Sequence, residues 1–114
     1  PVLDVAARSV GRLADAVRAL QREGRLAADA DARLLAEQMV AFQSMQLQNW
    51  AVGLIGLERY RLAARYQFLM LLRAWATPQS APALDATLRE RQREFRALDS
   101  RRHSHQPDPG RQAS

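Results

Sequence analysis

The apolar positions of the chain recur every three or four residues in several successive segments, a spacing typical of amphipathic helices. Residues 3–23 form the first such segment, and a glycine, Gly24, follows it at the position where a left-handed residue ends many helices. Gly11 interrupts the segment, and a glycine there indicates a close approach of another helix. The apolar stripe of this helix is Leu3, Ala6, Val10, Leu13, Val17 and Leu20.

Two longer segments follow and meet at a glycine-rich turn, residues 53–56. The first of them starts near Asp29 or Asp31, either of which can cap a helix, and the second runs from about residue 57 to residue 75, before Thr77 and Pro78. The connections are short, so we expect antiparallel neighbours. No charged residue occurs between Glu37 and Glu58, but the glutamines and asparagine of this stretch make it too polar to span a membrane.

The second half of the third segment is apolar almost all round, and such a helix must be covered on more than one side. A second copy of the chain is the simplest cover for the side that the first two helices leave free. We therefore predict a homodimer. The predicted interface residues are Trp50, Phe68, Leu72 and Trp75, and the alternative is that they belong to the core of one chain.

Polar amides stand inside the apolar arc of the second segment, and a buried amide without a partner costs about 1 to 3 kcal/mol. These residues are thus candidates for recognition of a small molecule. The predicted ligand-binding residues are Gln38, Phe42, Gln46 and Asn49. The alternative is that the amides bond to one another or across the dimer axis.

The fold expected from these patterns is all-α. It is an antiparallel bundle of three long helices over residues 1–78, which completes a four-helix bundle across a dimer. Residues 79–102 supply a linker and a peripheral helix from about residue 83 to residue 101. From His103 onward the chain has two prolines, a glycine and no large apolar residue, so residues 103–114 are expected to be a disordered tail.

Composition and charge limit the classes of function that the chain can have. The formal net charge is +5, and all 17 basic residues are arginines. Arginines and acids alternate at helical spacing, which is typical of solvated helix faces. Binding of nucleic acid remains a third alternative, through the arginines of the last helix, Arg89, Arg91, Arg93, Arg96, Arg101 and Arg102. The chain lacks cysteine and shows no secretory signal, so we expect a cytoplasmic protein with no membrane association.

The residue types needed for catalysis are not assembled in this sequence. There is no cysteine, no phosphate-binding glycine motif, and both histidines, His103 and His105, lie in the expected tail. These histidines with Asp108 are the one candidate metal site, and a tail does not pre-organise ligands. We therefore expect no enzyme activity, no metal and no cofactor.

The run from residue 17 to residue 78 resembles the C-terminal regulatory half of tetracycline-repressor-type (TetR) transcriptional regulators. The resemblance consists of a helix ending in QREGRL (residues 21–26), an acidic helix start at residues 29–31, a long helix with LLA (34–36) and LQNW (47–50), and a last long apolar helix. Met45 and Ala30 depart from it, since the family often has glycine and proline at these positions.

The resemblance implies a dimer in which the two long helices pair with their copies, and a small-molecule effector bound in the core of each subunit. It implies DNA contact only through a helix-turn-helix domain that is absent from this chain. The function expected is thus effector sensing and dimerisation in a TetR-like regulator. A helical adaptor, which would bind a partner helix through the exposed side of the third helix, is the alternative from another class.

Overall fold

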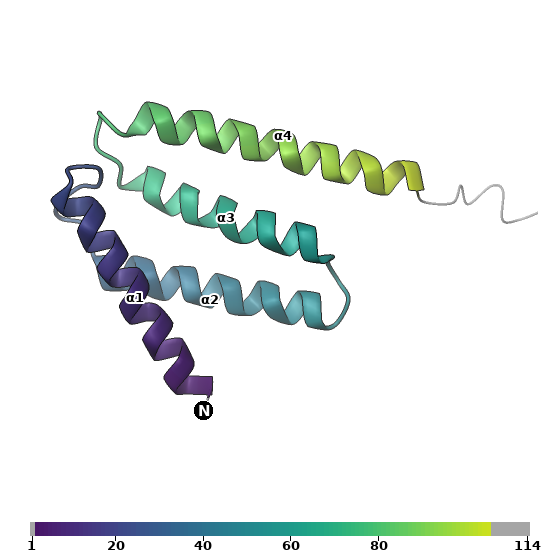
Figure 1. The fold of residues 1–114 in the computed structure, drawn as a ribbon, viewed down its shortest axis with the longest axis horizontal. Coiled ribbons are helices and arrows are strands. Elements are labelled where there is room, and N and C mark those ends of the chain that lie inside the picture. The colour runs from purple at the N-terminus through teal and green to yellow at the C-terminus, as the bar shows by residue number, and fades with distance from the viewer. Residues whose placement is uncertain (1, 106–114) are drawn as a thin grey trace, which may run out of the picture.

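The computed structural model describes the backbone of residues 2–105 and the side chains of residues 5–101. Four helices make up this part of the chain (Figure 1). They are α1 (Val2–Arg22), α2 (Ala32–Ala51), α3 (Leu57–Ala74) and α4 (Ala81–His105). The expected all-α fold is confirmed, and the helix ends lie within a few residues of those predicted from the periodicity.

Each helix packs on the helices that neighbour it in the chain (Figure 1). α2, α3 and α4 lie side by side and antiparallel, and α1 crosses the first half of α2 at an angle. The backbone extends over only 14 Å along its shortest axis, so the helices form a thin layer. The antiparallel arrangement is confirmed, with α4 at its edge, and the helices leave two broad faces open.

Three local signals in the sequence have the structural effect that was expected. Gly24 has a φ of 74° just after α1, and Gly53 has a φ of 80° after α2. Asp31 caps α2, because its carboxylate accepts a hydrogen bond of 3.0 Å from the backbone N–H of Leu34. The expectation for Gly11 is wrong, since a Cβ added there would meet nothing within 4 Å.

The core lies mainly between α1 and α2. One cluster joins Val17 of α1 to Leu35 of α2, and a second joins Val10 and Ala14 to Ala36. Met39 is the largest fully buried side chain among the described residues. The buried stripe of α2 is therefore Ala32, Leu35, Ala36 and Met39, whereas the apolar side chains of Leu34 and Met45 on the same helix are each 51% exposed.

Polar and aromatic contacts hold α4 against α3. Arg59 donates a 2.6 Å hydrogen bond to Asp99, and its guanidinium carbon lies 5.3 Å from the centre of the Phe95 ring. The Tyr66 ring packs edge-on against the Phe95 ring, with 5.8 Å between the ring centres, and the Tyr66 hydroxyl accepts a hydrogen bond from the side chain of Gln92. This seam explains why a helix with a narrow apolar stripe still packs along most of its described length.

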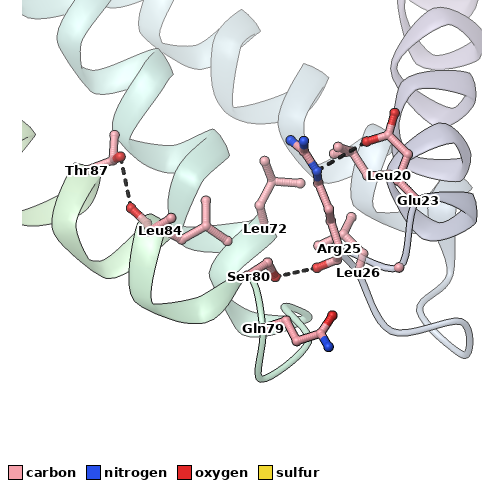
Figure 2. A pocket seen from close by; sticks show the side chains of 11 residues that line it. Leu20, Glu23, Arg25, Leu26, Leu72, Gln79, Ser80, Leu84 and Thr87 are labelled. Atoms are coloured by element: carbon pink, nitrogen blue, oxygen red, sulfur yellow. Dashed lines mark hydrogen bonds and ion pairs between the residues drawn. The ribbon is translucent and has the colours of Figure 1, made fainter.

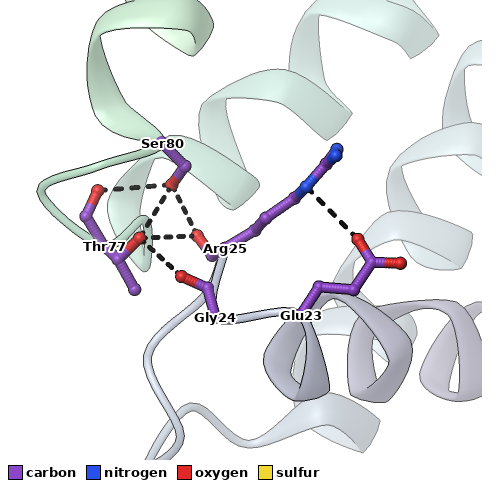
Figure 3. Close-up of polar contacts among 5 residues, drawn as sticks. All are labelled: Glu23, Gly24, Arg25, Thr77 and Ser80. Atoms are coloured by element: carbon purple, nitrogen blue, oxygen red, sulfur yellow. Dashed lines mark hydrogen bonds and ion pairs between the residues drawn. The ribbon is translucent and has the colours of Figure 1, made fainter.

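The two linkers at one end of the molecule are tied together, and we call this contact the clasp (Figure 3). Leu26 and Ala76 form an isolated antiparallel bridge between the α1–α2 and α3–α4 linkers. Thr77 donates its hydroxyl hydrogen to the carbonyl of Gly24 at 2.8 Å, and Ser80 donates to the carbonyl of Arg25 at 2.5 Å. Segments far apart in the sequence are thereby fixed to each other.

The boundary expected for the C-terminal tail needs a correction. α4 continues through His105, so residues 103–105, assigned to a disordered tail, are helical. The sequence pattern ended the helix too early because polar residues without an apolar stripe can still extend a helix that is already nucleated. Residues 106–114 lie outside the described residues.

Candidate functional site

A hollow of about 580 Å³ lies beside the clasp, between the end of α1 and the start of α4 (Figure 2). Leucines from three helices and a linker line it: Leu20 of α1, Leu26 of the first linker, Leu72 of α3 and Leu84 of α4. The volume falls within the range of small-molecule pockets, about 300 to 1,000 Å³. Most of the lining is apolar, as such sites require.

Polar groups stand at the rim of the hollow. Arg25 extends along one wall and pairs with Glu23 at 3.2 Å, with more than half of both side chains exposed (Figure 2). Thr87 lies on the opposite wall, on α4, where its hydroxyl donates to the carbonyl of Ala83. An exposed ion pair of this kind contributes little stability, so the guanidinium can exchange Glu23 for another anion at small cost.

The four predicted ligand-binding residues all lie on α2, away from this hollow. Gln38 is exposed, and Phe42, Gln46 and Asn49 are half-buried. None of them lines the hollow at the clasp or the two shallower hollows between α3 and α4. Within residues 5–101 no polar or charged residue is fully buried, so the chain itself does not enclose these amides.

The four predicted interface residues lie at different places on the hairpin of α2 and α3. Trp50 packs beside Tyr60 at 6.2 Å near the turn, and Trp75 ends α3 at the clasp. Both tryptophans are about two-fifths exposed. Phe68 and Leu72 are half-buried and line hollows. The structure therefore does not bring these four side chains into one patch.

One broad face of the α2–α3 hairpin carries no charged side chain, and we call it the uncharged face. Successive helix residues project about 100° apart, so Leu34 points about 160° away from Ala36, which packs on α1. Met70 likewise points away from Leu72, which lies on the α1 side. The members of this face are Leu34, Gln38, Ala41 and Met45 of α2 and Ala63, Gln67, Met70 and Ala74 of α3.

The uncharged face is open and carries apolar side chains. Leu34, Met45 and Met70 are each about half exposed. The side-chain oxygen of Gln67 is buried beside this face and has no hydrogen-bond partner in the described chain. Periodicity alone could have found the face, because its members recur at steps of three and four residues. The hollow has no such local signal.

The acids of α4 are engaged mainly by arginines of α3 and α4. Arg73 donates a 2.6 Å hydrogen bond to Asp85. This bond lowers the pKa of the Asp85 carboxyl from its ordinary value of 3.8, and desolvation opposes the effect only in part.

Arg91 pairs with Glu94. Arg101, another member of the basic set predicted for nucleic-acid binding, approaches Glu58 at 4.0 Å. Other exposed members are Arg89, Arg93 and Arg96, whereas the side chain of Arg102 lies outside the described part.

Neither a metal site nor a membrane-spanning helix is present in the described residues. No group of three or more metal-ligating side chains is found there, and the side chains of His103, His105 and Asp108 lie outside the described part of the chain. No helix in that part is long and apolar enough to cross a membrane.

Comparison with known proteins gives no relative: no protein-family model, no curated protein and no solved structure matches the chain.

Proposed function

We propose that this chain is the dimerisation and effector-sensing part of a TetR-like transcriptional regulator, and that the uncharged face of α2 and α3 is where two copies meet. The observation that carries the proposal is the open, uncharged face itself. It presents Leu34, Met45 and Met70, each about half exposed, on two antiparallel helices. Two such hairpins placed face to face form a four-helix bundle and remove these side chains from water.

The shape of the single chain supports this arrangement. Its core joins α1 to half of α2, and none of the residues of α3 is fully buried. A second hairpin would supply the layer that α3 lacks. Residues that carry the TetR resemblance, at positions 21–26 and 29–31, lie at the end of α1 and in the first linker, where the side chain of Gln21 donates to the carbonyls of Ala27 and Ala30.

Sedimentation velocity on the chain from about 1 to 100 μM tests the dimer. We expect a dimer for the unchanged chain, and a monomer for Met70→Glu, since a carboxylate buried without a partner costs several kcal/mol. Leu47→Glu is the matched control, because Leu47 is equally exposed but projects away from the uncharged face. A monomer at every concentration would overturn the dimer, and so would equal effects of the two substitutions.

The exposed turn between α2 and α3 favours a second candidate, a helical adaptor. Among the described residues, Val52 and Leu54 have the most exposed large apolar side chains, at 67% and 68%, and nearby Leu57 is 43% exposed. An adaptor would remain a monomer and would bind another protein through this end of the hairpin. Sedimentation separates the two candidates directly: a concentration-independent monomer supports the adaptor and excludes the dimer.

A further inference from the structure

We infer that the hollow beside the clasp binds an amphipathic organic anion, with its apolar body on the leucines and its anionic group at Arg25. This inference rests on the effector-sensing part of the proposed function, and it moves the ligand from the amides of α2 to the space between α1 and α4. The chemical class is an aromatic or aliphatic body of moderate size that carries one carboxylate or sulfonate.

The hollow is held open by the clasp. In the described chain α1 and α4 do not pack on each other, and the linker that follows α1 is bonded to the linker that precedes α4. The backbone N–H of Ala27 donates to the carbonyl of Trp75 at 2.8 Å, and that of Thr77 donates to the carbonyl of Arg25 at 3.1 Å. These bonds fix the walls, so a ligand meets a preformed space and loses less free energy in ordering it.

The lining accounts for the apolar part of the ligand. Leu72 lies between Leu20 and Leu84 in Figure 2, and all three line the hollow. Each is half-buried, so each still presents apolar surface to water. Covering that surface contributes about 25 cal/mol per Å² of apolar area removed from water. The hollow is thus an apolar trough with room for a ring system or an alkyl chain.

The charge at the rim of the hollow explains why the ligand is expected to carry an anionic group. The Nε of Arg25 contacts Glu23, and within the described residues its terminal guanidinium nitrogens form no hydrogen bond or ion pair. A guanidinium binds carboxylate and sulfonate groups through parallel hydrogen bonds. The net charge of +5 for the whole chain favours the approach of anions over cations.

Two fluorescent probes that share one apolar body test the inference. The probe 1-anilinonaphthalene-8-sulfonate carries an anionic group, whereas N-phenyl-1-naphthylamine has the same rings and no charge. Each is titrated into the full chain, and binding is followed by the rise in emission. We expect Arg25→Gln to weaken the sulfonate probe about tenfold, the value of one charge-assisted hydrogen bond, and to leave the neutral probe unchanged. Arg22→Gln, an exposed arginine outside the hollow, is the matched control.

A substitution that fills the hollow tests whether the probes bind there. Thr87→Trp places a large side chain in the hollow and should abolish binding of both probes, whereas Met70→Glu on the uncharged face should leave their binding intact. Circular dichroism checks that each variant is folded. The inference is overturned if Thr87→Trp binds the probes as well as the unchanged chain does, or if Arg25→Gln affects both probes equally.

Sedimentation of the same samples separates this inference from the proposed function. An intact dimer that binds neither probe overturns the hollow as a ligand site and leaves the dimer standing. A monomer that binds both probes, with the Arg25 effect confined to the sulfonate, supports the hollow and overturns the dimer.

Discussion

Replacing Leu35 by alanine tests whether the core lies where the structure places it. Leu35 is 5% exposed and belongs to the cluster with Val17 and Leu26. The substitution removes three buried carbons, worth about 0.8 kcal/mol each in transfer free energy, and it leaves a cavity. Measured Leu→Ala changes in cores span about 2.7 to 5 kcal/mol. We expect a loss of about 3 kcal/mol in the free energy of unfolding, measured by urea titration with circular dichroism.

The matched control is Leu47→Ala on the same helix. Leu47 is 47% exposed because it lies in the second half of α2, beyond the crossing with α1, so the same three carbons are already partly in water. We expect a loss of about 1 kcal/mol or less. Equal losses at the two positions would refute the placement of the core on the first half of α2, and so would a larger loss at Leu47.

Two further predictions concern the glycines of α1 and its C-terminal end, and the ion pair between Arg73 and Asp85. Gly24→Ala should lower the free energy of unfolding by about 1 to 2 kcal/mol, because the φ of 74° is strained for a residue with a Cβ; Gly11→Ala, in open space within α1, should raise it by up to about 1 kcal/mol, and thermal unfolding that gives both changes the same sign would contradict this. The lowered pKa of Asp85 means that its pair with Arg73 stabilises the fold above the unfolded-state pKa of about 3.9 and loses this effect as the pH falls through the folded-state pKa. The difference in melting temperature between the unchanged chain and Asp85→Asn should therefore be present at neutral pH and shrink below about pH 4; a difference independent of pH would contradict the assignment.

The sequence predicts the helices and their ends well because those signals are local. Gly24 and Gly53 supply the left-handed residues and Asp31 supplies a cap, each within a few residues of the backbone groups that it serves. The direction in which α2 faces was harder to predict. Its apolar residues surround much of the helix, and two of the four residues in its buried stripe are alanines, Ala32 and Ala36, which hardly stand out in a hydrophobic pattern.

The candidate sites depend on contacts that no local pattern encodes. Leu20 and Leu84 meet around one hollow only because α1 and α4 are brought to the same end of the molecule. The carbonyl of Gly24 accepts a hydrogen bond from Thr77 across 53 residues of sequence. The residues of the uncharged face, in contrast, recur at helical spacing and could have been found from periodicity, although the predicted interface consists of Trp50, Phe68, Leu72 and Trp75.

The clasp has a consequence for the order of folding. It closes a loop of 53 residues, and for a flexible chain the length-dependent entropy of such a closure is about 3 to 4 kcal/mol. The hairpin of α2 and α3 lies inside this loop, so once it has formed the ends of the loop are already close and most of that entropy has been lost. The clasp is therefore expected to form after the hairpin, and Thr77→Val should accelerate unfolding while it leaves the folding rate nearly unchanged.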